Sequence, residues 1–90
     1  MEFTGRVQGV GFRWKAAQLA KQYGLPGWVR NNEDGSVSME IQGENMAIFV
    51  LLDKLKNDPW IIVENYRADT IPVVKNEPGF RVISQWEEFE

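Results

Sequence analysis

The sequence predicts an α+β domain in which two helices cover one face of a mostly antiparallel sheet. Two segments carry apolar residues at helical spacing, and the segments around them alternate apolar and polar residues as strands do. Turn residues separate these segments, so strands and helices are mixed along the chain. Because the chain has 90 residues, of which 43% are hydrophobic, we expect a single core and one domain over residues 1–90.

The first half of the chain predicts a strand, a helix and a hairpin. The strand covers residues 2–7, and the helix covers residues 12–23 and ends at Gly24. The apolar stripe of this helix consists of Phe12, Ala16, Leu19, Ala20 and Tyr23. Two further strands, over residues 27–31 and 36–42, flank a turn-forming segment and are expected to pair as a hairpin.

The second half predicts one helix and two strands. The helix covers residues 45–56, with Asn45 as its N-cap. Its buried stripe consists of Ile48, Leu51, Leu52 and Leu55. The strands cover residues 61–69 and 80–84, and a proline-containing loop over residues 70–79 joins them. The complete order is β-α-β-β-α-β with an extra C-terminal strand, which matches the ferredoxin-like α/β sandwich.

Charge and composition exclude several functions. A net charge of −3 argues against nucleic-acid binding, which needs clustered positive charge. The chain has no histidine and no cysteine, which excludes a histidine or cysteine nucleophile, metal sites built from these residues, and disulfides. The first residues do not read as a signal peptide, and no apolar run approaches the length needed to cross a bilayer, so we expect a cytoplasmic protein without a membrane partner. A monomer is the default expectation.

A glycine-rich segment precedes the first helix. Gly9 and Gly11 let the main chain turn without Cβ obstruction, and the N–H groups at the helix start favour an anion. Arg13 adds a planar, permanently charged donor fork that suits phosphate oxygens. The segment therefore predicts a phosphoryl-binding site. The expected phosphate-binding residues are Gln8, Gly9, Val10, Gly11, Phe12 and Arg13.

Each of these features also has a purely structural interpretation. A glycine-rich turn can simply join a strand to a helix, and an arginine at a helix start is often solvated. An asparagine such as Asn31 is by itself typical of a turn. A dinucleotide-binding loop is excluded, because Trp14 stands where a third glycine would be needed.

Two blocks of sequence resemble the acylphosphatase family. The first runs from Gly5 to Arg13 and reads Gly-Arg-Val-Gln-Gly-Val-Gly-Phe-Arg. The second runs from Gly27 to Asn31, reads Gly-Trp-Val-Arg-Asn, and is followed by Gly35, Val37 and Gly43. The resemblance implies a ferredoxin-like hydrolase that cleaves the carboxyl–phosphate bond of acyl phosphates. Its products would be a carboxylate and inorganic phosphate.

The resemblance also implies the catalytic residues. Arg13 and the loop amides would hold the phosphoryl group, Asn31 would orient a water for in-line attack, and the substrate's own phosphate would accept the water proton. Neither a cofactor nor a metal is implied. Related domains inside larger proteins usually have proline after the arginine, whereas this chain has Trp14, so the resemblance favours the free-standing enzyme.

Two alternatives to hydrolysis stay open. A domain of the same fold can bind phosphoryl ligands for regulation without turning them over. An RNA-binding module of this fold would need exposed aromatic and basic residues on the sheet, and the acidic balance argues against it.

The remaining polar and aromatic residues are interpreted mainly as structural. Glu33 and Asp34 lie in the hairpin turn, where acidic residues are common, rather than forming an acid/base pair. Arginines expected on the strand surface are Arg6 and Arg30. Aromatic residues expected in core or edge packing are Phe49, Trp60, Tyr66 and Phe80. Trp14 and Trp28 are expected at the pocket mouth or in packing, and the acidic tail over residues 86–90 at a sheet edge.

Overall fold

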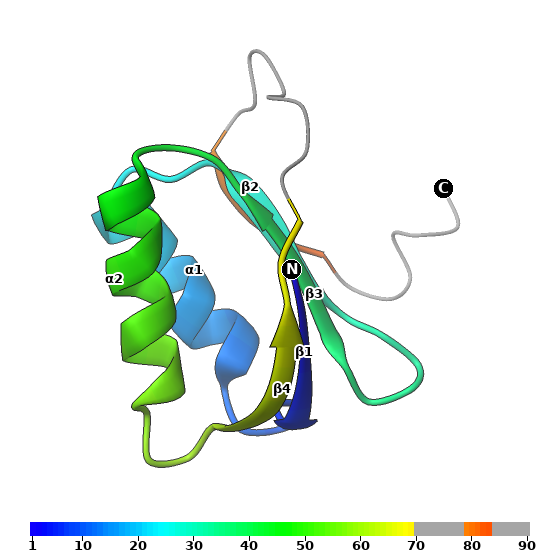
Figure 1. Cartoon of the computed structure of the whole chain (residues 1–90). Helices are drawn as coiled ribbons and strands as arrows, with labels where there is room; N and C mark the ends of the chain where they lie inside the picture. The colour runs from blue at the N-terminus through cyan, green and yellow to red at the C-terminus, as the bar shows by residue number, and fades with distance from the viewer. Residues whose placement is uncertain (70–78, 84–90) are drawn as a thin grey trace.

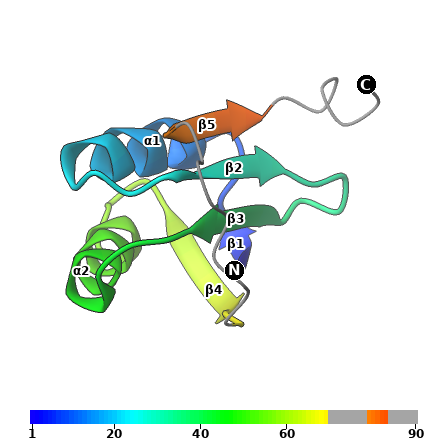
Figure 2. The ribbon, with the colours of Figure 1, turned by 90° about the horizontal axis from the view of Figure 1, so that it is seen from above.

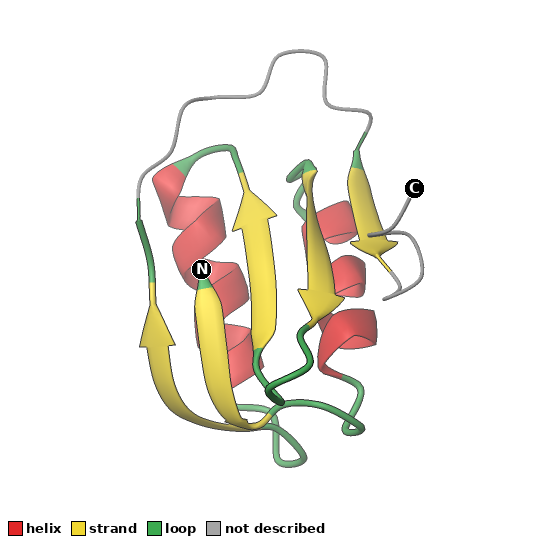
Figure 3. Cartoon of the chain, turned by 90° about the vertical axis from the view of Figure 1, so that its right-hand side faces the viewer, coloured by secondary structure: helices red, strands yellow, loops and turns green. Residues whose placement is uncertain are grey.

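The computed structural model describes residues 1–69 and 79–83 and contains a five-stranded sheet with two helices on one face (Figure 1). The elements in chain order are β1 (Glu2–Arg6), α1 (Phe12–Gln22), β2 (Gly27–Asn31), β3 (Val37–Ile41), α2 (Asn45–Lys56), β4 (Ile62–Arg67) and β5 (Phe80–Ile83). Figure 3 shows the strands in front of both helices, so neither of the two helices in the described residues covers the opposite face of the sheet. The predicted ferredoxin-like α+β fold is confirmed.

The strands are arranged in the order β4-β1-β3-β2-β5. Neighbouring strands are antiparallel except for β2 and β5, which are parallel. The predicted extra strand β5 therefore lies at the edge of the sheet beside β2, and α1 packs against both (Figure 2). This arrangement brings the chain near residue 82 close to the first helix.

The core forms where the helices meet the sheet. The fully buried side chains of the sheet are Phe3, Val29, Val37 and Met39. The buried side chains of the helices are Phe12, Ala16, Ala17, Leu19, Ala20, Leu51 and Leu55. Each large apolar side chain buried in this way stabilises the fold by roughly 1.5–3 kcal/mol. The predicted apolar stripes of both helices therefore face the sheet, with Tyr23, Ile48 and Leu52 only partly buried.

Helix α1 ends in a glycine motif, as predicted. Gly24 has a left-handed φ of 65°. The N–H of Leu25 donates to the carbonyl oxygen of Ala20 at 2.8 Å, which is the long hydrogen bond of a Schellman motif. This tight ending turns the chain directly into β2.

The β2–β3 hairpin determines where β2 ends. Its register pairs Gly27 with Ile41 at one end and Asn31 with Val37 at the other. Beyond Asn31, the N–H of Asn32 donates to the carbonyl oxygen of Ser36 at 2.8 Å and starts the turn. Asn31 is therefore the last residue of β2, held by the ladder at the end of the strand nearest the turn.

Some predicted details of the elements are wrong. The N-cap of α2 is Glu44, not Asn45, because the N–H of Ile48 donates to the carbonyl oxygen of Glu44 and the helix is entered one residue earlier. Three strands are shorter than predicted: β1 ends at Arg6, β3 covers Val37–Ile41 and β4 covers Ile62–Arg67. The range of β2 is confirmed, and residue 84, the predicted end of β5, lies outside the described residues. Most of the loop over residues 70–79, and the tail over residues 86–90, lie outside the described residues.

The aromatic residues fall into two groups. Phe80 is buried, and Tyr66 stacks on Phe3 with ring centroids 5.6 Å apart, so their packing is confirmed. Phe49 is 66% exposed and Trp60 is 74% exposed, so the expectation that they pack is wrong. Because an α-helix has 3.6 residues per turn, the position of Phe49 lies on the side of α2 opposite its buried stripe. Trp60 lies in the short connection between α2 and β4.

Candidate active site

The loop between β1 and α1 turns through two glycines with a left-handed backbone. Gly9 and Gly11 have left-handed φ values of 73° and 83°, which residues with a Cβ rarely adopt. Gly11 is the N-cap of α1, without a side-chain cap, and the N–H of Lys15 makes the first bond of the helix, to the Gly11 oxygen at 2.9 Å. The N–H groups of Phe12 and Arg13 therefore have no acceptor in the helix and can bind an anion.

A pocket of about 310 Å³ opens beside this loop. It is lined by Val7, Gly9, Gly11, Phe12, Arg13, Trp14, Asn31 and Val82. These residues come from the loop, the first turn of α1, the end of β2 and the edge strand β5. Of the residues expected to bind phosphate, Gln8 and Val10 do not line the pocket.

The charge in this pocket is positive. None of the described lining residues is a carboxylate, and the first turn of α1 contains no acidic residue. Within residues 1–69 and 79–83, the guanidinium of Arg13 makes no hydrogen bond or ion pair. The helix dipole adds a partial positive charge at the same point. Arg13 is therefore available to an anionic ligand in the pocket.

Asn31 lies at the pocket with an unsatisfied oxygen. Alternation along β2 puts its side chain on the same face as the buried Val29, which is the helix-covered face. Its Oδ1 is buried and accepts no hydrogen bond from the described residues. Leaving a buried carbonyl oxygen unpaired costs about 1–3 kcal/mol. This oxygen is therefore a candidate acceptor for a donor that is not part of the described chain.

Gln8 connects the loop to the hairpin through its side chain. Its Nε2 donates to the carbonyl oxygens of Asn32 at 2.7 Å and Ser36 at 2.9 Å. These two oxygens lie on either side of the turn that follows Asn31, so Gln8 joins the loop carrying Arg13 to the strand carrying Asn31. Sequence reasoning considered only the backbone of Gln8, and a polar residue in a loop gives no signal of such a contact.

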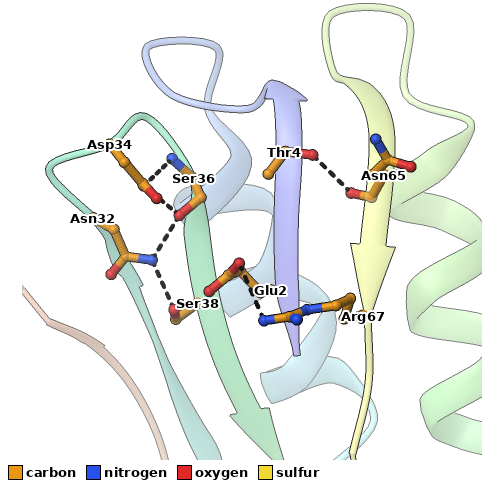
Figure 4. A network of polar contacts seen from close by, with 8 residues as sticks. All are labelled: Glu2, Thr4, Asn32, Asp34, Ser36, Ser38, Asn65 and Arg67. Atoms are coloured by element: carbon orange, nitrogen blue, oxygen red, sulfur yellow. Dashed lines mark hydrogen bonds and ion pairs between the residues drawn. The ribbon is translucent and has the colours of Figure 1, made fainter.

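A network of polar side chains stabilises the hairpin turn (Figure 4). The Nδ2 of Asn32 donates to the hydroxyls of Ser36 at 2.9 Å and Ser38 at 2.7 Å. The Oδ1 of Asp34 accepts from the hydroxyl of Ser36 at 2.6 Å and from its backbone N–H at 2.9 Å. The hydroxyl bond and then the backbone bond hold the pKa of Asp34 below its usual value. Asp34 thus acts within the turn and does not line the pocket.

Other charged and aromatic residues near the two blocks point elsewhere. Lys15 forms an ion pair with Asp58 at 3.5 Å and does not line the pocket. Arg30 lies over the ring of Trp28, with its Cζ 5.4 Å from the ring centroid. Trp28 therefore belongs to packing rather than to the mouth of this pocket, whereas Trp14 lines the pocket.

The described residues contain neither a metal-binding cluster nor a membrane-spanning helix. Residues 1–69 and 79–83 contain no group of three or more acidic, histidine or cysteine residues that could hold a metal ion. Neither of the two helices there has both the length and the apolar character needed to cross a bilayer.

Fold and pocket together define a small α+β domain with a positively charged pocket beside a glycine-rich loop. The sequence model of the acylphosphatase family matches residues 1–82. An acylphosphatase of Lactobacillus gasseri is 38% identical over 92% of this chain and 93% of its own. One of Geobacillus kaustophilus is 50% identical over 88% of this chain and 85% of its own. The crystal structure of Bacillus subtilis acylphosphatase superposes with a TM-score of 0.83 at 30% identity, covering 91% of this chain and 92% of that one. The chain belongs to the acylphosphatase family.

Proposed function

We propose that this protein hydrolyses the carboxyl–phosphate bond of acyl phosphates, without a metal or cofactor, through direct in-line attack of water. The observation that carries the proposal is the pocket that Arg13 and Asn31 both line: Arg13 supplies an unpaired cation, and Asn31 has a buried carbonyl oxygen without a donor. Membership of the acylphosphatase family supports the same reaction.

The phosphoryl group binds at the loop. Its oxygens accept hydrogen bonds from the Arg13 guanidinium and from the backbone amides of the segment from Gln8 to Arg13. These donors are held in place before the reaction, so they stabilise the charge on the transferring phosphoryl group without reorganising. Gly9 and Gly11 allow this because their left-handed backbone exposes the amides.

Asn31 positions the nucleophile. Its Oδ1 accepts a hydrogen bond from a water molecule and holds it on the side of phosphorus opposite the acyl oxygen. The bond from the water oxygen to phosphorus forms as the bond from phosphorus to the acyl oxygen breaks. One water proton passes to a phosphoryl oxygen of the substrate, and the electron pair of the broken bond leaves on the carboxylate. Because a carboxylate is a weak base, no general acid is needed.

Hydrolysis of benzoyl phosphate in the presence of a chelator tests the proposal. Arg13→Ala is expected to lower kcat/KM by on the order of 100- to 1000-fold, because it removes the charged donor to the transferring group. The matched control is Arg81→Ala, an exposed arginine of β5 outside the pocket, which keeps wild-type activity. If wild-type protein releases no phosphate without added metal, the proposal is wrong.

Asn31→Ala tests whether Asn31 positions the attacking water without contributing to binding of the phosphoryl group. We expect kcat to fall about 100-fold with little change in KM, since the water is misplaced while the phosphoryl site remains. Asn65→Ala, in exposed strand β4, is the control. Full turnover in Asn31→Ala would disprove the role of this residue. Phosphate binding to the wild type without any turnover would instead support the alternative, a silent regulatory domain.

A further inference from the structure

One wall of the pocket is apolar and open to solvent. Trp14 is 67% exposed and Val82 is 43% exposed, and both line the pocket. The pocket wall also includes the buried side chains of Val7 and Phe12. Exposed large apolar side chains that gather at a cavity mark a surface for an apolar group.

Tertiary structure brings Trp14 and Val82 to the same pocket. In the parallel ladder, Val82 pairs with the buried Val29, and paired residues face the same side of a sheet. Val82 is therefore on the helix-covered side of β5. Trp14 lies in the first turn of α1, the helix that packs against β5 (Figure 2). The two side chains thus come from opposite ends of the chain to one end of α1.

The pocket has a polar part and an apolar part. Arg13 and the loop amides make the part that suits a phosphoryl group, whereas the ring face of Trp14 and the methyl groups of Val82 carry no positive charge for such a group and offer an apolar surface instead. Pockets of about 300 Å³ and more accept organic ligands that are larger than a phosphoryl group alone. The observed volume of about 310 Å³ therefore leaves room for a substituent beside the anion.

We propose that Trp14 and Val82 form the acyl subsite and make the enzyme prefer acyl phosphates with an aromatic or branched acyl group over acetyl phosphate. The inference rests on the hydrolase function proposed above. With the phosphoryl group on the loop, the acyl group extends along the indole and the valine methyls. A ring covers this wall and removes apolar area from water, whereas a single methyl group covers little of it.

The preference is measured as a ratio of two specificity constants, kcat/KM for benzoyl phosphate divided by kcat/KM for acetyl phosphate. Comparing this ratio between variants cancels the difference in intrinsic reactivity of the two substrates. Trp14→Ala is expected to lower the ratio about tenfold, the lower end of the effect that one methylene group has in an apolar pocket. Trp14→Phe keeps an aromatic face and is expected to keep most of the preference.

Two further variants make the test specific. Val82→Thr has nearly the same shape but a hydroxyl in place of a methyl group, and is expected to lower the ratio by a smaller factor. If Trp14→Ala does not fold, Val82→Thr still tests the same apolar wall of the pocket. Trp60→Ala removes a tryptophan that is 74% exposed but lies outside the pocket, and the ratio is expected to stay at its wild-type value.

The outcomes distinguish this inference from the proposed function. The acyl subsite is overturned if Trp14→Ala and Val82→Thr both keep the wild-type ratio. This includes the case in which the variants lose activity equally on the two substrates. In both cases the wild type still hydrolyses acyl phosphates. If the wild type hydrolyses neither substrate, the hydrolase function itself is wrong. Competition by phenylphosphonate and methylphosphonate gives a second readout, in which Trp14→Ala weakens only the phenyl compound.

Discussion

Gln8 and Asp34 are single residues on which the geometry of the site depends. The side-chain amide of Gln8 donates hydrogen bonds to two backbone carbonyl oxygens of the hairpin turn. Asp34 satisfies the hydroxyl and N–H of Ser36 within that turn. Neither side chain would touch the phosphoryl group. Both hold in place the turn that follows Asn31, so their effects on catalysis are expected to be indirect.

Replacing Gln8 tests the connection between the loop and the hairpin. Gln8→Ala removes two hydrogen bonds, each of which contributes about 0.5–1.5 kcal/mol, so the free energy of unfolding is expected to fall by about 1–3 kcal/mol. Urea denaturation measures this. Turnover is also expected to fall, because Asn31 is less well positioned. Gln18→Ala, on the exposed side of α1, is the control. Wild-type stability in Gln8→Ala would show that the connection is unimportant.

Asp34 gives the turn a dependence on pH. Its pKa in the folded protein lies below the ordinary value of 3.8, so the carboxylate stabilises the fold fully above pH 3.8. This stabilisation is lost as the pH falls through the folded-state pKa. The difference in unfolding free energy between wild type and Asp34→Ala is therefore expected to shrink in acid, and an NMR titration of the carboxyl group gives the pKa directly. Titration at or above 3.8 would contradict the assignment.

At the scale of elements, the β2–β3 hairpin contains a close approach of its two strands. Gly27 has a φ of 152°, and a Cβ at this position would overlap the backbone oxygen of Glu40 on the facing strand. The two strands can approach this closely only because residue 27 is glycine. The pairing of β2 with β3 therefore also determines where Asn31 lies relative to the loop between β1 and α1.

A methyl group at Gly27 tests this close approach. Gly27→Ala is expected to destabilise the protein by about 3 kcal/mol, since backbone strain and overpacking each cost roughly 1–3 kcal/mol. Gly35→Ala is the matched control, because its φ of 92° is also left-handed but a Cβ there meets nothing within 4 Å. It should cost only about 1 kcal/mol. Equal losses in denaturation experiments would mean that the contact with Glu40 is not limiting.

At the scale of the whole molecule, a protein of net charge −3 carries a positive pocket. Attraction of an anion is therefore local to the loop and Arg13 rather than a property of the entire surface. A ligand that binds only the folded state must also stabilise it by mass action. Binding at the pocket is thus coupled to the stability of the complete fold.

Phosphate is expected to raise the thermal stability of the protein. At a free concentration of 100 times Kd, it adds about 2.7 kcal/mol to the free energy of unfolding. Thermal unfolding in phosphate and in chloride at equal ionic strength measures the effect. Arg13→Ala should abolish most of it, while Arg81→Ala should keep it. The same increase in Tm in Arg13→Ala would place the phosphate elsewhere.

Local sequence patterns predicted most of the fold and part of the candidate site. The helical stripes and the alternating strands follow from side-chain periodicity, and the glycine motif after α1 from backbone sterics. The N-cap of α2 and the exposure of Phe49 and Trp60 were missed, because each depends on how the segment meets its neighbours. The contacts of Gln8 join residues 24 and 28 positions apart in sequence, which no local pattern encodes.

The sequence by itself determined the order of the elements, the loop of Gly9 and Gly11, and the residue types available for chemistry. These depend on interactions between neighbours in the chain. Only the tertiary structure decided that β5 lies beside β2, that Val82 joins Trp14 at one pocket, and that Arg13 and Asn31 face the same cavity. Strand order and packing arise from the burial of one shared core, so these contacts exist only in the assembled fold.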